Sequence, residues 1–320
     1  MMVFIDEERV RIVAEKLREL GRVPCEMDLY DEKYYPPRNA DRELVARYFL
    51  VMVAMDHRLS RPNRPYEAVV SGEKFHGADL LYRLGALMLE EDPDWFSPER
   101  LARVTASDVK QWLSADTASP PDPEVRAELL RDLGRVLLSL YDGSVLRLLE
   151  ESGGMLRRGV AEGLLDRLRI FKAYMDPVEK KSHLLAKFLE RRGVIRIGDP
   201  QHKRVPVDNH VTRLALRVGI VCVKRSMLDK ILRQEEFSYE EDVLLRITVR
   251  EAWHLVCEEA GLDDYLLDDF LWVFGRSYCT RGKPRCTSSE EKECPLKEVC
   301  ATASTGLVID EHNYYETWYY

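Results

Sequence analysis

The chain has 320 residues, of which 45% are hydrophobic and 32% are charged, and its formal net charge is −8. This is the composition of a globular protein, and the length is sufficient for one large or two modest domains. No stretch approaches the roughly 18 apolar residues that a membrane helix needs, and the first residues lack the pattern of a secretory signal. We therefore expect a cytoplasmic monomer without a membrane partner.

The predicted elements are almost all helices, because apolar residues recur at positions i, i+3 and i+4 along the chain. In chain order, helices are expected at residues 7–20, 41–55, 77–89, 98–104, 107–113, 123–141, 144–151, 164–173, 179–192, 209–218, 227–232, 240–260 and 263–274. Ser97 and Asp208 stand where helices should begin and are good N-caps. Strand signals are few, and the best of them lie at residues 194–197 and 307–310. The pattern predicts an all-α fold.

The charge is unevenly distributed. Residues 155–204 contain thirteen Lys and Arg against six Asp and Glu, although the whole chain is acidic. A negative net charge disfavours tight, non-specific binding of duplex DNA, which depends on neutralised phosphates. The basic stretch is either a solvated helix surface or a surface that faces phosphates, and the sequence leaves both interpretations open.

Four of the seven cysteines gather near the end of the sequence, at Cys279, Cys286, Cys294 and Cys300, with the spacing C-x6-C-x7-C-x5-C. A reducing cytosol disfavours disulfides, whereas four thiolates suit a soft metal centre. Zinc sites usually use closer C-x2-4-C pairs, and an iron–sulfur cluster tolerates wider loops. The spacing favours a cluster over zinc without excluding zinc.

The residues around the first two cysteines resemble a known cluster loop. LWVFGRSYC at residues 271–279, followed by KPRC at 283–286, is similar to the cluster loop of the endonuclease III family, in the helix-hairpin-helix (HhH-GPD) DNA glycosylase superfamily. That family has the spacing C-x6-C-x2-C-x5-C, so the middle interval is longer here. The resemblance implies a [4Fe-4S] cluster on the four cysteines.

The same resemblance implies an architecture of two helical lobes with an active-site cleft between them. It places a helical barrel with a degenerate hairpin at residues 40–199, and a cluster domain at residues 1–39 and 200–304. Residues 305–320 remain as an aromatic tail ending in NYYETWYY. Because exposed aromatic clusters are unfavourable in water, we expect this tail to dock on the body of the protein.

A candidate catalytic residue comes from RVPVDNHVTRL at residues 204–214, which resembles the family's Val-Asp-Thr-His-x-x-Arg stretch. The resemblance makes Asp208 the catalytic carboxylate, because loss of a base builds positive charge on the sugar and a carboxylate stabilises it. It places His210 at the substrate and Arg213 at nucleic acid. The alternative is that Asp208 is only an N-cap.

The hairpin that names the superfamily has its counterpart in MDPVEKKSH at residues 175–183. Lys181 falls where bifunctional members keep a Schiff-base lysine, which implies lyase activity; a desolvated lysine loses its proton more easily. The alternative is that Lys180 and Lys181 are a solvated pair. Pro177 and Glu179 replace glycines whose amides approach a DNA phosphate in the family. These two residues therefore do not predict the family's usual binding of duplex DNA.

A base-wedging glutamine motif of the family is absent, and the corresponding residues 53–58 read VAMDHR. Asp56 and His57 are candidate substrate-binding residues, or else polar groups at a helix end. Residues 44–59 and HGAD at 76–79 are, more weakly, similar to the queuosine nucleoside glycosidases. That resemblance implies a free nucleoside as the substrate.

The first hypothesis is therefore an N-glycosylase that removes a damaged or modified base from DNA in base excision repair, with lyase activity through Lys181. The second is an N-glycosidase for a modified nucleoside or RNA. The third is a non-catalytic nucleic-acid-binding module. Basic residues expected to contact nucleic acid are Lys180, Arg213, Arg281, Lys283 and Arg285.

Overall fold

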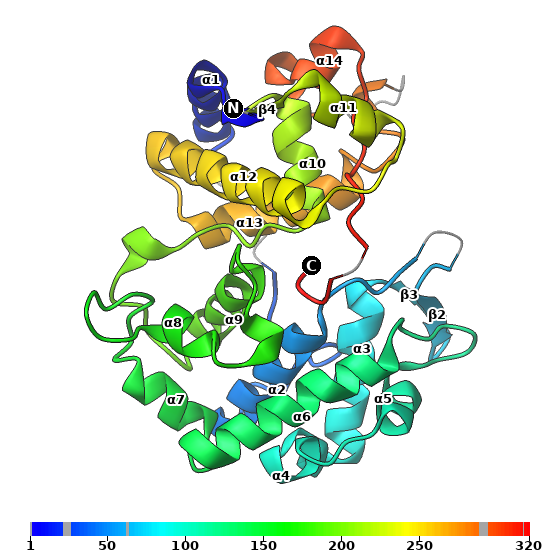
Figure 1. The fold of residues 1–320 in the computed structure, drawn as a ribbon, viewed down its shortest axis with the longest axis vertical. Helices are drawn as coiled ribbons and strands as arrows, with labels where there is room; N and C mark the ends of the chain where they lie inside the picture. The colour runs from blue at the N-terminus through cyan, green and yellow to red at the C-terminus, as the bar shows by residue number, and fades with distance from the viewer. Residues whose placement is uncertain (1, 22–26, 62–63, 288–293, 316) are drawn as a thin grey trace. The chain divides into compact units, whose positions relative to one another are not determined.

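The computed structural model describes residues 2–21, 27–61, 64–287, 294–315 and 317–320. The chain forms two compact units. Unit 1 consists of Met1–Met27 and Lys203–Glu316, and unit 2 consists of Asp28–His202 and Thr317–Tyr320. Both units are built mainly of helices, which confirms the expected all-α fold (Figure 1). Within the described part of the chain, every helix is too short or too polar to cross a membrane.

Unit 2 contains eight α-helices and one β-hairpin among its described residues. The helices are α2 (Arg42–Met55), α3 (Ala78–Glu91), α4 (Pro98–Leu101), α5 (Ala106–Leu113), α6 (Pro123–Leu140), α7 (Val145–Glu151), α8 (Leu164–Leu168) and α9 (Lys180–Arg191). The hairpin pairs β2 (Glu67–Val70) with β3 (Glu73–His76), and short 3-10 helices lie at η1 (Pro93–Phe96), η2 (Lys172–Tyr174) and η3 (Pro200–His202).

The core of unit 2 is built around α2, which contacts α3, α6, α7 and α9 (Figure 1). All residues of α2 from Tyr48 to Met55 are buried, because a helix that is apolar on every side must be enclosed by its neighbours. Asp41 starts the helix by accepting hydrogen bonds from the amides of Glu43 and Leu44. Arg126 of α6 secures its other end, since the buried guanidinium donates to the Met55 and His57 carbonyls at 2.7 and 2.8 Å.

Unit 1 has six described α-helices and one two-stranded antiparallel sheet. The helices are α1 (Glu7–Glu19), α10 (Asn209–Val218), α11 (Arg225–Leu232), α12 (Tyr239–Ala260), α13 (Asp264–Ser277) and α14 (Ala301–Thr305). The sheet pairs β1 (Val3–Ile5) with β4 (Val221–Val223), and 3-10 helices lie at η4 (Arg285–Thr287) and η5 (Lys297–Val299). The longest of these helices, α12, packs against α1, α10 and α13.

The two predicted strands were wrong. Residues 194–197 form a turn after α9, where the amides of Val194 and Ile195 both donate to the Leu189 carbonyl. Residues 307–310 are extended without a strand partner, and Arg217 binds the Ile309 carbonyl. In both places alternating apolar residues suggested a strand, but neither segment pairs with a strand among the described residues.

The units also divide the chain at different points from those expected. Residues 28–39 belong to unit 2, because Arg192 of α9 donates to the Leu29, Pro36 and Pro37 carbonyls. Thr317–Tyr320 likewise returns to unit 2 instead of forming part of a separate tail.

Candidate functional site

Asp208 lies at the N-terminus of α10 in unit 1. Its Oδ1 accepts a hydrogen bond from the Val211 amide at 2.8 Å, so the residue is an N-cap, as its position predicted. Among the described residues, no hydrogen bond uses its Oδ2. The helix ends at Gly219, whose φ of 90° is the left-handed conformation typical of a C-cap glycine. The cap therefore fixes the carboxylate while leaving one oxygen for chemistry.

One turn into α10, His210 and Arg213 share a carboxylate. The Glu311 Oε1 lies 3.1 Å from His210 Nδ1 and also accepts from the fully buried Arg213 guanidinium. Burial alone would raise the pKa of Glu311, but His210 and Arg213 outweigh that effect and hold the pKa at about 2. Arg213 also donates to the Gly275 and Cys279 carbonyls. Its expected phosphate contact is not compatible with this placement, because a side chain without exposed surface cannot reach a phosphate.

A second buried network holds Asn209, the residue after Asp208. Arg246 of α12 donates to Asn209 Oδ1 at 2.7 Å and to Asp242 at 2.8 Å. His312 Nε2 lies 2.7 Å from the same Asp242 carboxylate. Sequence reasoning missed these three supporting residues, although Asp242 and Arg246 have the i, i+4 spacing of a helical ion pair.

Lys181 lies in the first turn of α9, in unit 2, and has no exposed surface. Its Nζ donates to the Ala54 carbonyl at 2.7 Å and the Trp318 carbonyl at 2.6 Å, and lies 3.2 Å from His57 Nδ1. Burial, and then the positive charges of Lys180 and Arg126, lower the pKa of Lys181 well below its usual value. The alternative of a solvated lysine pair is therefore wrong for Lys181.

The other two candidates from the end of α2 contact this lysine pair. Lys180 Nζ donates to the Asp56 carbonyl at 2.8 Å, and the Asp56 carboxylate is 3.9 Å away. His57 is buried, and burial, together with Arg126 and Lys181, lowers its pKa well below the usual value. Asp56, His57, Lys180 and Lys181 thus form one polar cluster. Asp208 belongs to unit 1 and is not part of this cluster.

The turn before α9 is the counterpart of the superfamily's hairpin. Here the Asp176 carboxylate accepts hydrogen bonds from the amides of Val178 and Lys180, at 2.8 and 2.5 Å. Glu179 adopts a left-handed φ of 60°, and its buried carboxylate pairs with Arg157 and Arg169. At the two positions where the family has glycines, Pro177 has no amide and the Glu179 amide donates to the Asp176 carbonyl at 3.1 Å, so neither offers an amide to a DNA phosphate.

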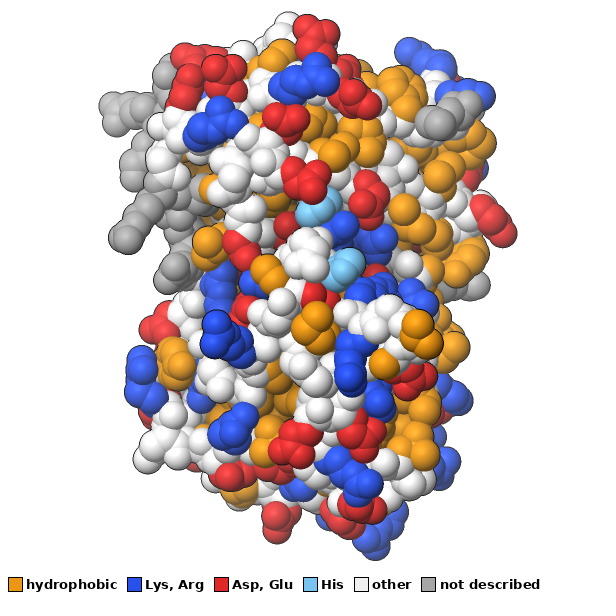
Figure 2. All heavy atoms as spheres, turned by 90° about the vertical axis from the view of Figure 1, so that its left-hand side faces the viewer, with side chains coloured by type: hydrophobic (Ala, Val, Ile, Leu, Met, Phe, Trp, Pro, Cys, Tyr) orange, Lys and Arg blue, Asp and Glu red, His pale blue; other side chains and the backbone are white. Residues whose placement is uncertain are grey.

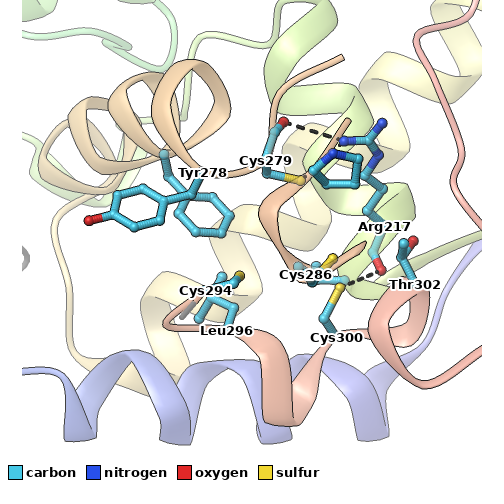
Figure 3. Close-up of a pocket in the computed structure, with 11 residues that line it drawn as sticks. Arg217, Tyr278, Cys279, Cys286, Cys294, Leu296, Cys300 and Thr302 are labelled. Carbon is cyan, nitrogen blue, oxygen red and sulfur yellow. Dashed lines mark hydrogen bonds between the residues drawn. The ribbon is translucent and has the colours of Figure 1, made fainter. Parts of the chain in front are cut away.

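The four cysteines Cys279, Cys286, Cys294 and Cys300 line one pocket in unit 1 (Figure 3). Arg217 reaches this pocket from α10 and donates to Cys279 Sγ at 3.3 Å, while Cys300 Sγ donates to the Arg217 carbonyl. Burial and, secondarily, the neighbouring cysteines raise the pKa of Cys294 to about 11. No three described Cys, His, Asp or Glu side chains converge closely enough to hold a single metal ion.

The basic residues of the cysteine loop lie at its surface but are partly engaged. Arg281 donates to Gln234 Oε1 at 2.9 Å, and the Arg285 guanidinium lies 4.5 Å from the centre of the Tyr278 ring. Lys283 is exposed. On the face that Figure 2 shows, Lys and Arg side chains are interspersed with Asp and Glu side chains.

The comparisons with known proteins give two kinds of similarity. The family model described as "Queuosine salvage protein" matches residues 36–281. This match covers well over half of the chain and includes Lys181, Asp208 and Cys279. The chain belongs to the queuosine salvage protein family.

Two curated proteins are similar to this chain over different extents. The chain is 24% identical over 311 residues to a queuosine 5′-phosphate N-glycosylase/hydrolase from Bos taurus, with 86% of this chain and 89% of that protein covered. It is 25% identical to DEMETER-like protein 3 from Arabidopsis thaliana over 135 residues, which is 40% of this chain and 12% of that protein.

Solved structures confirm the fold that the cysteine loop predicted. A trapped endonuclease III–DNA covalent intermediate matches with a TM-score of 0.53 at 13% identity, covering 95% of this chain and 99% of that chain. A non-covalent endonuclease III–DNA complex gives the same TM-score at 14% identity. The fold is therefore that of endonuclease III.

Proposed function

We propose that this protein is an N-glycosidase that hydrolyses the bond between base and sugar in queuosine 5′-phosphate or a closely related modified nucleotide. Two observations support this substrate class. The family match extends over both candidate catalytic residues, and the bovine relative named for this activity aligns over most of its length. Of the functions that the sequence suggested, this is closest to the second.

The observation that carries the choice of a small nucleotide over duplex DNA is the bonding of Asp176. A helix-hairpin-helix binds a DNA backbone through exposed amides, and here the Glu179 amide is bound to the Asp176 carbonyl. The neighbouring amides of Val178 and Lys180 are bound to the Asp176 carboxylate. Glu179 adds negative charge at the same turn. A single nucleotide needs no such backbone contact, so the loss of the hairpin's function does not affect it.

In the proposed reaction a water molecule attacks the sugar C1′, the bond from C1′ to the base nitrogen breaks, and a new C1′–oxygen bond forms. Asp208 takes the proton from water through its Oδ2 and stabilises the positive charge that develops on the sugar. The departing base nitrogen takes up a proton from solvent, which balances the proton that the attacking water gives to Asp208. Lys181 forms no covalent bond, and it acts within unit 2 by holding the end of α2 through the Ala54 carbonyl and His57 Nδ1.

The proposal also includes a [4Fe-4S] cluster held by Cys279, Cys286, Cys294 and Cys300. The residues fit such a group, because all four thiols line one pocket and the buried Arg217 offsets the negative charge of a thiolate. A cluster binds each cysteine at a separate iron, so the thiols need not converge on a single ion. Bound there, the cluster would crosslink the loop to the residues around it.

Metal analysis tests this part directly. We expect about four irons and four acid-labile sulfides per chain after anaerobic purification. Cys279→Ser should remove most of the iron, whereas Cys257→Ser should keep it, because Cys257 is a buried thiol of α12 that does not line the pocket. One zinc per chain without sulfide would contradict the cluster.

The activity is tested by base release from queuosine 5′-phosphate, from free queuosine and from duplex DNA with modified bases. We expect release from the nucleotide and none from the duplex. The binding of duplex DNA should be weak and lost at moderate salt, since few phosphates are neutralised. Release from DNA alone would overturn the proposed substrate and restore the first hypothesis.

A further inference from the structure

The surroundings of Lys181 include a segment that neither catalytic motif contains. A lysine Nζ is tetrahedral and carries three positions besides its bond to Cε. In unit 2 these three positions are occupied by the Ala54 carbonyl, His57 Nδ1 and the Trp318 carbonyl. The shortest of the three contacts, at 2.6 Å, is the one to Trp318.

The three partners differ in how they are held. Ala54 and His57 lie at the end of α2, which is fixed by the Arg126 guanidinium. The Trp318 carbonyl comes from Thr317–Tyr320, more than a hundred residues away in the sequence. Lys181 therefore contacts a segment that is separated in the sequence from the rest of unit 2 by residues 203–316 of unit 1.

Thr317–Tyr320 is docked on unit 2 at two further points. The Trp318 indole Nε1 donates to the Lys172 carbonyl at 3.2 Å, and the Arg58 amide donates to the Tyr320 carbonyl at 2.7 Å. The Tyr320 side chain is buried. The contacts of Trp318 with Lys172 and of Tyr320 with Arg58 therefore hold the Trp318 carbonyl in place without any contribution from Lys181.

We propose that Thr317–Tyr320 is a positioning element for Lys181, and that it acts through the main-chain carbonyl of Trp318. The activity part of this inference rests on the proposed N-glycosidase function, but the positioning part does not. A lysine side chain loses rotamer entropy when it is fixed, so each removed partner makes other rotamers accessible. Without the carbonyl, Nζ has an unfilled position and water can reach it.

The contact between the Trp318 carbonyl and Lys181 lies among several charged groups. The charged or titratable groups that face it are Asp56 and His57 at the end of α2, Arg126 of α6, Asp176 of the turn, and Lys180 of its own helix. Lys180 and Arg126 repel an ammonium, whereas Asp56 and Asp176 attract it. A main-chain carbonyl adds an acceptor without adding another charge to this balance.

Amine labelling tests the positioning without any substrate. The full chain, a variant that lacks residues 318–320, and Trp318→Phe are treated with formaldehyde and cyanoborohydride, and the methylated lysines are located by peptide mass spectrometry. We expect Lys181 to be unmodified in the full chain and in Trp318→Phe, which keeps the carbonyl, and to become modified at least tenfold faster in the deletion. Lys180 should stay protected in all three, because its Nζ binds the Asp56 carbonyl.

A side-chain variant, Tyr320→Ala, guards against a deletion that fails to fold. It keeps the Trp318 carbonyl as an uncharged main-chain group and removes the buried Tyr320 side chain, so labelling of Lys181 should be intermediate. The melting temperature of each variant is measured beside the labelling. If Lys180 and Lys181 become reactive together in the deletion and in Tyr320→Ala, the segment supports the fold as a whole and the inference is wrong.

Base release from queuosine 5′-phosphate then tests the functional consequence. Removal of residues 318–320 should lower kcat at least tenfold and change KM less than about threefold, because a displaced Lys181 affects the reaction more than ground-state binding. Increased activity would show instead that the segment obstructs the substrate site, and unchanged activity would also overturn the inference. If the full chain releases no base while the labelling result holds, the proposed function fails and the positioning role stands.

Discussion

The starts of α10 and α9 show two ways of placing a reactive side chain at the N-terminus of a helix. In α10, Asp208 caps the helix with one oxygen and keeps the other unbonded among the described residues. In α9, Lys181 is fully buried, and every position on its nitrogen is filled. A cap orients a group without changing its chemistry, whereas burial changes the chemistry itself, since it lowers the pKa of Lys181.

The largest expected effect is on the rate of base release, and it distinguishes the catalytic role of Asp208 from its role as a helix N-cap. Asp208→Asn should lower the rate of base release by about a hundred- to a thousandfold, because an amide neither accepts a proton nor stabilises positive charge on the sugar. The melting temperature should change little, since Asn caps a helix as well as Asp does. Asp6→Asn, at the cap of α1, is the matched control and should keep full activity. Full activity of Asp208→Asn would remove this residue from the mechanism.

The pH dependence of the unfolding free energy tests whether Glu311 stabilises α10 through His210 and Arg213. Its pKa of about 2 lies below its ordinary value of 4.5, so its stabilising contribution is complete above pH 4.5 and disappears as the pH falls toward 2. This difference corresponds to about 3 kcal/mol of unfolding free energy. Urea unfolding between pH 7 and pH 3 should show a flatter pH dependence in Glu311→Gln than in the wild type. The exposed pair of Glu235 and Arg233 provides the control, and Glu235→Gln should reproduce the wild-type curve.

A smaller effect is expected in the turn before α9. Asp176→Ala leaves the amides of Val178 and Lys180 without their acceptor, which should lower the free energy of unfolding by about 1–3 kcal/mol. Asp28→Ala, which removes an exposed carboxylate from a similar local contact with the Tyr30 amide, should change it by less than about 0.5 kcal/mol. Equal losses in the two variants would mean that the hairpin amides gain little from Asp176.

The smallest signal concerns the lyase activity that Lys181 suggested. Borohydride reduction in the presence of queuosine 5′-phosphate, or of DNA with an abasic site, should trap no more covalent adduct in the wild type than in Lys181→Ala. The reason is that Nζ has no open position for a sugar carbon while its three partners are in place. A trapped adduct specific to the wild type would establish the lyase step and show that one partner leaves during the reaction.

The sequence predicted the helices well because their signals are local. The caps at Ser97 and Asp208 and the apolar spacing of α10 depend only on neighbouring residues. The sheet of β1 and β4 could not be predicted in the same way, since these strands pair across more than two hundred residues and no local pattern specifies that pairing. The hairpin of β2 and β3 is a local pairing that the sequence analysis missed.

For the site, the motifs led to Asp208, Lys181 and the four cysteines, but not to the residues that support them. Arg246, Glu311 and the Trp318 carbonyl act through contacts between distant segments. The carbonyl is also a main-chain group that every residue carries, so no sequence motif could have marked it. The phosphate role expected for Arg213 failed for a related reason, because burial is a property of the assembled helices.

The docking of Thr317–Tyr320 also determines when the Lys181 site can exist during synthesis. Residues 28–202 contain the core of unit 2 and emerge from the ribosome well before residue 317. Domains fold as their chain becomes available, so unit 2 can form its helices while Lys181 still lacks its third partner. A chain released early, or cut before residue 317, would therefore keep Ala54 and His57 beside Lys181 and lose the contact that completes the site.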